Sequence, residues 1–356
     1  MKPQGKKLLF TLALTALFGY SSFAQQQVAE FLKFDLNDAQ KLGDAYIQPF
    51  GKMFGNSLNG GWYQAARPHK LFGFDLTFTT VVSLPFPDEK TFDFNSLGLS
   101  SSLVLANPEN NISPSLTGKG DGIGINYTTT IEGTQLSVPI TLPKGANLLF
   151  TPMPFVQGSI GLPYHNELTV RFFPSVEIPK VGRMEMWGVG LKNEFKEFIP
   201  GLKMVPIDLS LMVGYTKFSS QFNVSYKPDA ANINNNPSYP SLSEFSDQKL
   251  GLDANGITAR VLVGKSIPIL SVYAGLGYSY AKTDFGLTGL YPLSINENGE
   301  PTNIITAEDP LNFNFVYNDF SANLGFRLRF GVIAFNVDYT LSKYPLFAAG
   351  FGISFR

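Results

Sequence analysis

The sequence predicts an all-β fold: a transmembrane antiparallel β-barrel of about 12 strands, within a range of roughly 10 to 14, preceded by a short helical N-terminal segment. Three observations lead to this fold class. The chain opens with the pattern of an export signal, its composition is low in charge and high in aromatic residues, and most of its length alternates apolar with small or polar residues. Such alternation has the period of a β-strand, in which successive side chains point to opposite faces.

The first segment, residues 1–24, has the pattern of a secretory signal peptide. Three lysines precede an apolar run at residues 8–20, which at about a dozen residues is too short to span a bilayer. Small residues lead up to a predicted cleavage after Ala24. The chain has no cysteine, which excludes disulfides, thiolate metal sites and lipid attachment through an N-terminal cysteine.

The composition of the 356 residues is typical of a membrane barrel. Only 15% of the residues are charged, against about a quarter in an average protein, while 14% are aromatic and 34 are glycines. The net charge of −1 gives no reason to expect a nucleic-acid partner. After the signal there is no apolar run of ~18 residues, so helical membrane spans are not expected. A soluble secreted β-sandwich is the alternative, but it would normally carry more charge on its outer faces.

Residues 25–69 form the helical N-terminal segment. Leu36, Ala39, Leu42 and Tyr46 follow helical spacing, and Pro49 is expected to end this helix or to restart a second short one. Two interpretations stay open. The segment either packs as a periplasmic cap under the barrel, which we take as the default, or it enters the lumen as a plug.

Residues 70–356 form the predicted barrel. The clearest period-two segments are residues 207–216, 270–280, 320–330 and 333–340. Each is about as long as a tilted strand needs to cross the hydrocarbon layer.

The connections predict the orientation of the barrel. Long polar stretches at about 228–247 and 289–310 alternate with short links, and such barrels place short turns in the periplasm and long loops outside. Counting back from the last strand gives roughly nine strands after residue 150. Between about one and five more are expected within residues 71–149, where strands, a large extracellular loop or both would fit the poorer alternation.

The chain stops on a strongly patterned strand. Alternate residues from Phe347 to Phe355 are apolar, and those between them are small or polar. This segment resembles the C-terminal strand of bacterial outer-membrane barrels, in which a glycine is followed by two apolar or aromatic positions. Gly350, Ile353 and Phe355 occupy those places, whereas the final Arg356 departs from the common form. The resemblance implies membrane insertion with the help of the barrel-assembly machinery.

Charged residues on the predicted inward faces are candidate lumen contacts. The selected five are Asp208, Arg260, Arg327, Arg329 and Asp338, and a wider set adds Arg171, Arg183 and Glu185. As the default they form an internal ion-pair network, because charges removed from water need partners. As the alternative they form a basic lining that guides an anionic solute.

No catalytic residue, metal site or cofactor is predicted. The two histidines, His69 and His165, are expected before the first strand and in a turn, and the chain has no Gly-x-Ser-x-Gly motif. The glycine-rich residues 118–124 offer one carboxylate where a calcium loop needs several.

Three stretches, residues 49–63, residues 73–76, and residues 187–192 with the 197–200 that follow, resemble an uncharacterised family of Bacteroidota outer-membrane β-barrel proteins. That family has no assigned catalytic or binding residues. A helical segment before a barrel is also similar in architecture to the long-chain fatty acid transporter family, although fold alone does not give function.

Together these features predict a porin-like channel or transporter in the cell outer membrane, and not an enzyme. It would carry a small hydrophobic or amphipathic solute, with the N-terminal segment as plug or gate. The alternative is a non-conducting structural or assembly component of the envelope, as a partner of secretion or motility machinery. The expected partners are outer-membrane lipid, the barrel-assembly machinery and a small-molecule solute, without nucleic acid.

Overall fold

The computed structural model describes residues 28–131, 134–178, 181–296 and 298–355. The predicted signal peptide, residues 1–24, and Arg356 lie outside the described residues. Among the residues described, no helix combines the length and the apolar character needed to cross a membrane.

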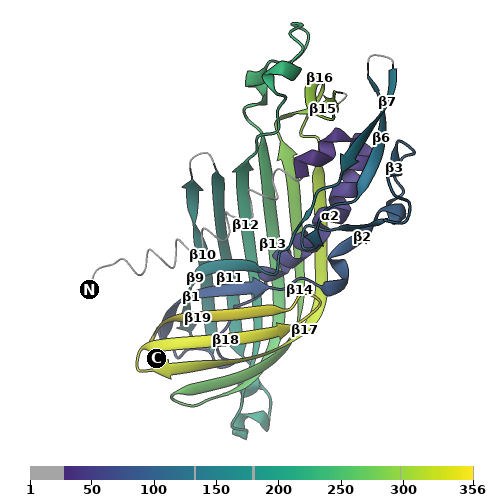
Figure 1. The fold of residues 1–356 in the computed structure, drawn as a ribbon. Helices are drawn as coiled ribbons and strands as arrows, with labels where there is room; N and C mark the ends of the chain where they lie inside the picture. Colours follow the sequence, from purple (N-terminus) through teal and green to yellow (C-terminus); the bar gives the residue numbers. More distant parts are fainter. Residues whose placement is uncertain (1–27, 132–133, 179–180, 297, 356) are drawn as a thin grey trace.

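Ten antiparallel strands of the described residues form a closed barrel (Figure 1), which confirms the predicted fold class. The ring closes because β1 is hydrogen-bonded to β9 on one side and to β19 on the other. The barrel strands are β1 (Phe74–Ser83), β9 (Thr151–Leu162), β10 (Asn166–Ile178), β11 (Gly182–Glu194), β12 (Asp208–Asn223), β13 (Lys249–Ser266), β14 (Leu270–Thr288), β17 (Asn312–Phe330), β18 (Ile333–Leu341) and β19 (Leu346–Phe355).

The number of strands is at the lower end of the predicted range. Nine of the ten strands follow residue 150, as counting back from the C-terminus predicts. The favoured total of about 12 is wrong because only β1 joins the barrel from residues 71–149. The chain between β1 and β9 is interrupted by turns into short elements, and a membrane strand needs about 9–11 residues.

The N-terminal segment consists of η1 (Glu30–Lys33) and the long helix α2 (Leu36–Ser57). The Asp35 side chain caps α2 by accepting a hydrogen bond of 3.0 Å from the Asn37 backbone N–H. The expected break at Pro49 is wrong, since one helix continues through this residue. Its contacts with β1, β9, β13, β14 and β17 stabilise the helix against the loss of one backbone hydrogen bond.

Helix α2 lies inside the barrel. Gly43 and Gly51 face the rings of Phe313 and Phe315 on β17, and Gly55 faces Thr283 on β14, with no room for a Cβ at any of the three. Residues 58–69 continue through the interior, where Leu58, Trp62, Ala66 and His69 are buried, and the chain emerges at the exposed Leu71 and Phe72 before β1. The segment therefore occupies the lumen, and the default interpretation of a cap under the barrel does not describe it.

The two ends of the barrel differ in their connections. The long-loop end carries residues 84–150, residues 224–248 with η6 (Ala230–Asn232) and η7 (Leu242–Phe245), and residues 289–311 with β15 (Leu290–Ile295) and β16 (Pro301–Glu308). The opposite, short-turn end carries residues 163–165, 267–269 and 331–332, and residues 195–207 with η4 (Lys196–Phe198) and η5 (Leu202–Met204). Helix α2 starts at the long-loop end, where Gln40 Nε2 donates to the Asn312 carbonyl at 2.9 Å.

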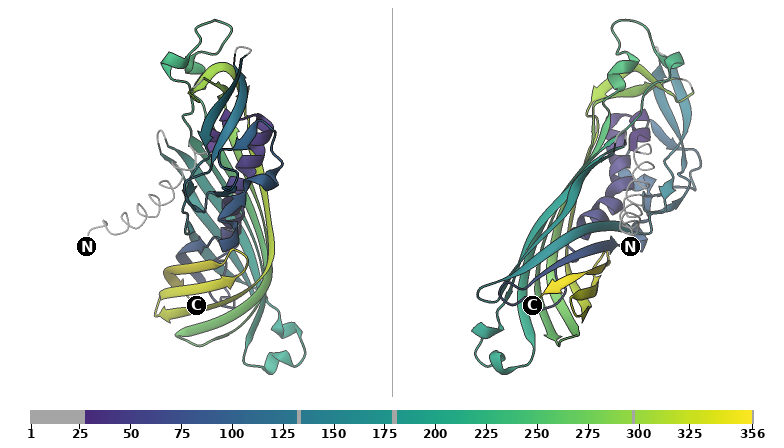
Figure 2. Two further views of the ribbon diagram at one scale, coloured as in Figure 1. Left: turned by 45° about the vertical axis from the view of Figure 1, so that its right-hand side comes forward. Right: turned by 90° about the vertical axis from the view of Figure 1, so that its left-hand side faces the viewer.

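Residues 84–150 fold over helix α2 at the long-loop end, as the two views in Figure 2 show. The Leu116 N–H donates to the Tyr46 carbonyl at 2.9 Å, and the Tyr46 hydroxyl donates to the Lys144 carbonyl at 2.7 Å. The elements of this cover are η2 (Pro87–Glu89), β2 (Thr91–Asp93), η3 (Phe94–Leu97), β3 (Leu103–Leu105), β4 (Ile112–Pro114), β5 (Lys119–Gly120), β6 (Gly124–Ile131), β7 (Thr134–Thr141) and β8 (Gly145–Ala146).

The alternation in the last strand is as predicted. In β19 the side chains of Phe347, Phe351, Ile353 and Phe355 are exposed, while Ala348 and Ser354 are buried. The ring of Phe355 stacks on that of Phe74 with 5.0 Å between centroids, at the pairing of β19 with β1.

Two paired glycines of the wall make room for the segment in the lumen. Gly190 on β11 is opposite Gly214 on β12, and the Trp62 ring lies against both. A Cβ on Gly214 would lie 2.5 Å from that ring. We therefore expect Gly214→Ala to destabilise the protein by about 1–3 kcal/mol through overpacking, measured as a lower urea midpoint in lipid vesicles.

Two variants serve as controls. Gly251→Ala on β13 should be neutral, because the nearest atom to its added Cβ lies 3.7 Å away. Combining Gly214→Ala with Trp62→Leu should recover part of the loss. Equal effects at Gly214 and Gly251 would contradict the fit of Trp62 against the wall.

Candidate functional site

Helix α2 ends at a buried arginine of the barrel wall. Arg171 on β10 is fully buried, and its Nη1 donates to the Gly60 carbonyl at 2.7 Å. Its Nη2 donates to the Leu58 carbonyl and to the Thr216 hydroxyl oxygen. The guanidinium also lies 3.7 Å from the centroid of the Trp62 ring. Carbonyls at a helix C-terminus carry partial negative charge, so Arg171 both satisfies them and joins the wall to the end of α2.

A cluster of buried charges holds the chain closer to the short-turn end. Glu167 accepts from the His69 backbone N–H at 2.8 Å and lies 2.7 Å from its ring Nδ1. Lys192 Nζ lies 2.8 Å from the same carboxylate. The other ring nitrogen of His69 is 3.3 Å from Asp75, whose carboxylate is 3.5 Å from Arg327. Through these contacts His69, in the stretch that follows α2 in the lumen (the lumen segment), is linked to side chains of β1, β10, β11 and β17.

A second polar chain starts at Tyr63. Its hydroxyl donates to Asn323 Oδ1 at 2.8 Å, and Asn323 Nδ2 donates to Asp338 Oδ2 at 2.6 Å. Thr340 donates to the other oxygen of Asp338 at 3.1 Å. Burial raises the pKa of the Tyr63 hydroxyl, so it remains a protonated donor.

Four of the five predicted lumen contacts are buried in the interior. Arg327 and Asp338 belong to the contacts just described, and Asp208 accepts from Arg67 Nε of the lumen segment at 2.8 Å. Arg260 is buried and donates to Ser279 Oγ at 3.4 Å.

The fifth predicted contact, Arg329, lies at the short-turn end. It is partly exposed and donates to the Pro268 carbonyl at 3.3 Å. Arg183 and Glu185, of the wider set, form an exposed pair 2.7 Å apart, so their inward prediction is wrong. The reason is that Met184 and Met186 take the inward positions of β11.

Glu167 and Lys192 are interior residues that we did not predict. The period-two pattern of β10 and β11 places both side chains inward near the strand ends, so the alternation alone could have identified them as interior residues. His69 was expected only before the first strand, and no sequence pattern links it to Glu167, which is 98 residues away. Of the residues that the structure describes, no group of three or more His, Cys, Asp and Glu is placed to hold a metal ion.

The outer surface of the barrel around these buried polar contacts is apolar. Every barrel strand exposes large apolar side chains, and together they form an outer apolar belt. One from each strand, in chain order, is Leu76, Ile160, Val170, Val189, Val213, Val261, Leu276, Leu324, Phe335 and Phe351. The belt thus surrounds a lumen filled with buried polar contacts.

On β12, β13 and β14 the belt ends at a row of polar residues on the outer face. Lys217 on β12 is opposite Asn255 on β13, which is opposite Lys282 on β14. Toward the long-loop end from this row the interior becomes apolar. Phe54 of α2 contacts Phe218 of β12 with 5.0 Å between ring centroids, just past Lys217.

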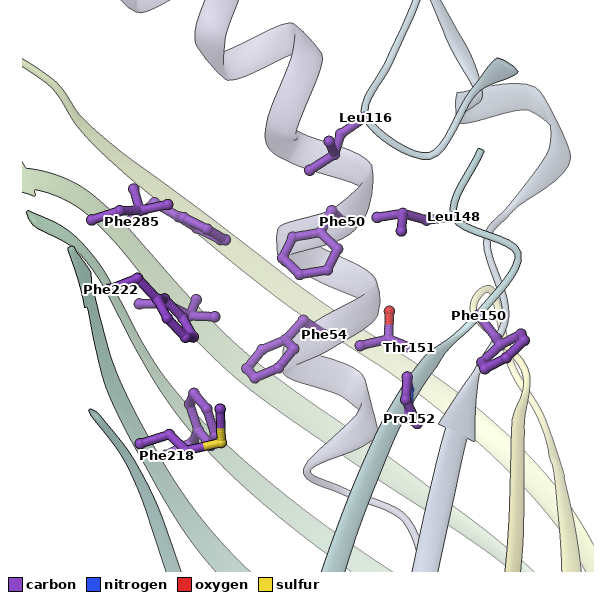
Figure 3. A pocket seen from close by; sticks show the side chains of 13 residues that line it. Phe50, Phe54, Leu116, Leu148, Phe150, Thr151, Pro152, Phe218, Phe222 and Phe285 are labelled. Carbon is purple, nitrogen blue, oxygen red and sulfur yellow. The ribbon is translucent and has the colours of Figure 1, made fainter. Parts of the chain in front are cut away.

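An apolar pocket lies in the half of the barrel nearer the long loops, between helix α2, the wall and the chain leading into β9 (Figure 3). Its empty volume is about 700 Å³, which includes space open to solvent. The lining residues are Phe50, Phe54, Leu116, Leu148, Phe150, Thr151, Pro152, Met184, Phe218, Phe222, Leu250, Leu252 and Phe285. Among these described residues only Thr151 has a polar side chain.

The wall beside the pocket is incompletely paired. The hydrogen-bonded register of β9 and β10 runs from Leu162 opposite Asn166 to Val156 opposite Phe172. Beyond Val156, β9 is paired with β1, and beyond Phe172, β10 is paired with β11. Among the described residues, 151–155 of β9 and 174–178 of β10 are thus not paired with each other, and this stretch of β9 includes Thr151 and Pro152 of the pocket.

The sequence matches the profile of one protein family across residues 4–355, a family described as "Family of unknown function (DUF6588)". No curated protein matches the chain significantly.

Several solved outer-membrane proteins are similar in structure. The attachment invasion locus protein Ail of Yersinia pestis is 8% identical, with a TM-score of 0.27, over 80% of this chain and 99% of that chain. The translocator domain of the autotransporter NalP from Neisseria meningitidis is 9% identical, with a TM-score of 0.30, over 85% and 93%. The Ralstonia pickettii toluene transporter TbuX is 7% identical, with a TM-score of 0.26, over 85% and 93%. TM-scores this low say nothing about what this chain does.

The buried charges predict a large effect of removing Glu167. Glu167→Ala leaves Lys192 and His69 buried without their carboxylate, and we expect a loss of about 3–5 kcal/mol in unfolding free energy, measured with urea in lipid vesicles. Glu185→Ala, which breaks the exposed pair with Arg183, should have no measurable effect.

The double variant Glu167→Leu/Lys192→Leu should recover much of the stability, because an apolar pair removes both buried charges. If Glu167→Ala and Glu185→Ala are equally stable, the cluster does not hold the lumen segment.

Proposed function

The chain belongs to the DUF6588 family of unknown function, and we propose that it is an outer-membrane β-barrel that takes up a small hydrophobic or amphipathic molecule, with the N-terminal segment, described from residue 28 to residue 69, as the plug. The observation that carries this proposal is the apolar pocket between α2 and the wall. It lies at the long-loop end, on the side from which a solute outside the cell would arrive.

The pocket is suited to a ligand because its surface is costly to expose to water. Six phenylalanines and several aliphatic side chains line a space that the protein leaves unfilled. Protein interiors are normally packed to crystal-like density, and concave apolar surfaces are the usual binding sites for small molecules.

The outer apolar belt supports the membrane location. Exposed side chains such as Leu276, Leu324 and Phe320 would be unfavourable in water over so continuous a surface, and lipid would cover them. The polar row from Lys217 to Lys282 then marks the upper edge of the hydrocarbon layer. The pocket lies above that edge, near the outer membrane surface.

Access to the pocket is between residues 151–155 of β9 and residues 174–178 of β10, which are not paired with each other. Backbone groups without partners are costly in hydrocarbon, so this break belongs at the polar boundary or above it. Ser175 and Glu177, exposed on the part of β10 that pairs with β11 but not with β9, fit that level. A molecule partitioned into the outer leaflet would meet the opening from the side.

Passage beyond the pocket requires the plug to move. The path toward the short-turn end is blocked by Arg171, Trp62 and the buried charges around Glu167. The plug therefore acts as a gate, and transfer of a solute would have to break these contacts.

The same contacts favour the second candidate, a non-conducting structural or assembly component of the envelope. A lumen held by several buried ion pairs and a buried arginine is suited to a permanently closed barrel. In this case the pocket would bind without transfer.

Binding is tested by filling the pocket. Leu252→Trp on β13 places a large side chain in the lining, and we expect the affinity for the apolar probe N-phenyl-1-naphthylamine to fall at least tenfold in lipid nanodiscs. Asp253, the next residue, is exposed on the outer surface, so Asp253→Trp should leave the affinity for the probe unchanged. Equal affinities in both variants and the natural protein would rule out the pocket as the site.

Assembly is tested at the last strand, where we propose that Gly350, Ile353 and Phe355 engage the barrel-assembly machinery. Phe355→Ala should lower the amount of folded barrel in the outer membrane severalfold, seen as loss of the heat-modifiable gel band. Phe347→Ala, on the same exposed face, should have a smaller effect. Equal losses would assign the effect to lipid contact alone.

A further inference from the structure

The lumen segment ends at a histidine that lies between two carboxylates. His69 is the last buried residue before the chain emerges, and only 5% of its side chain is exposed. Its ring Nδ1 is 2.7 Å from Glu167 Oε2, and its Nε2 is 3.3 Å from Asp75 Oδ2. The two carboxylate side chains are also buried, with 4% of Glu167 and 3% of Asp75 exposed. The ring therefore faces an acceptor on each side.

Glu167 determines which ring nitrogen carries a hydrogen. Its carboxylate also accepts from the His69 backbone N–H at 2.8 Å and lies 2.8 Å from the Lys192 ammonium, which keeps it ionised. An ionised carboxylate can only accept, so Nδ1 carries the hydrogen that joins the two side chains. In a neutral imidazole the other nitrogen, Nε2, then has no hydrogen and presents a lone pair.

That lone pair would face Asp75, a second acceptor. Neither Nε2 nor Asp75 Oδ1 has a hydrogen-bond partner in the part of the chain that the structure describes. A separation of 3.3 Å leaves no space for a water between Nε2 and Asp75 Oδ2. Arg327 Nη2, 3.5 Å from the same oxygen, attracts the carboxylate but is not hydrogen-bonded to it. A proton between Nε2 and Asp75 would turn two opposed acceptors into a hydrogen bond.

We propose that the closed barrel holds one proton between His69 Nε2 and Asp75, and that this proton is a pH-sensitive latch on the end of the plug nearest the short turns. When the proton leaves, two acceptors face each other, and residues 58–69 separate more readily from the wall. The latch does not depend on what the apolar pocket binds, so its test is separate from that of the proposed function.

The direction of the pH response follows from proton binding in the two states. Opening of the lumen segment would expose His69 and Asp75 to water, where imidazole loses its proton near pH ~6.5 and a carboxyl group near pH ~4. Above pH ~6.5 the closed form therefore holds one more proton than the open form. A rise in pH then favours the open form, by up to tenfold per pH unit for one proton.

The other charged groups around the ring do not titrate in this range. The cations are guanidinium or ammonium groups, and Glu167 and Asp208 are each paired with a cation, so the shared proton is the one that changes. By element, the charged groups are Asp75 (β1), Glu167 (β10), Lys192 (β11), Arg327 (β17), and Arg67 of the lumen segment, which is paired with Asp208 (β12).

The latch is tested by hydrogen–deuterium exchange of the full mature protein in lipid nanodiscs, read by mass spectrometry between about pH 6 and about pH 9. Rates are corrected for the intrinsic effect of pH on amide exchange, and peptides from β13 and β14 are the internal reference. The protection of residues 58–69 should fall by up to tenfold per pH unit above pH ~6.5, while that of β13 and β14 stays constant.

Three variants separate the latch from other causes. Asp75→Asn supplies an amide N–H that can donate to Nε2 at every pH, so the protection of residues 58–69 should no longer depend on pH. His69→Gln removes the titrating ring, should also abolish the response, and decides the test if Asp75→Asn lacks the heat-modifiable gel band. His165→Gln changes the second histidine of the chain, whose side chain is 57% exposed in a turn, and should keep the full response.

Each protein is compared with itself across pH, so a uniform loss of stability in a variant does not affect the result. The inference is overturned if the protection of residues 58–69 in the natural protein does not fall with pH. It is also overturned if Asp75→Asn or His69→Gln keeps the natural slope, or if His165→Gln loses it. A parallel loss in β13 and β14 would mean that pH acts on the whole barrel, and the latch would be rejected.

Discussion

A buried guanidinium is costly unless its N–H groups are hydrogen-bonded. Arg171 donates to the Leu58 and Gly60 carbonyls at the end of helix α2. This contact sets the depth of the helix in the barrel. Because the helix end is held at β10, Phe54 and Phe50 are held one and two turns higher, opposite Phe218 and Phe285 of the wall. The apolar pocket therefore depends on a polar contact below it.

The barrel has two halves of opposite polarity. Toward the short turns the outside is apolar and the inside contains Glu167, Lys192 and other buried polar groups, whereas toward the long loops the outside is polar and the pocket inside is apolar. Lipid outside the first half would exclude water, so polar groups inside must pair with one another. The second half is enclosed by α2 and residues 84–150, which keep its apolar interior from water. The lumen is therefore filled toward the short turns and contains an apolar pocket toward the long loops.

The period-two pattern predicted much of this architecture. It placed nine strands after residue 150, the outward face of β19, and the inward positions of Asp208, Arg260, Arg327 and Asp338. It failed where the local pattern competes with packing. Helix α2 continues through Pro49 because its strand contacts compensate for the lost hydrogen bond. Arg183 and Glu185 face outward because Met184 and Met186 take the inward side of β11, where the pocket needs apolar residues.

The sequence by itself determined the class of fold, the faces of most strands and the two ends of the barrel, because these follow from the alternation and loop lengths of contiguous segments. Only the tertiary structure decided that α2 and residues 58–69 enter the lumen and that residues 84–150 fold over α2. His69 meets Glu167 across 98 positions, and Trp62 fits against Gly190 and Gly214 of two different strands. Such pairings depend on where separate segments meet in space, and no local periodicity encodes that.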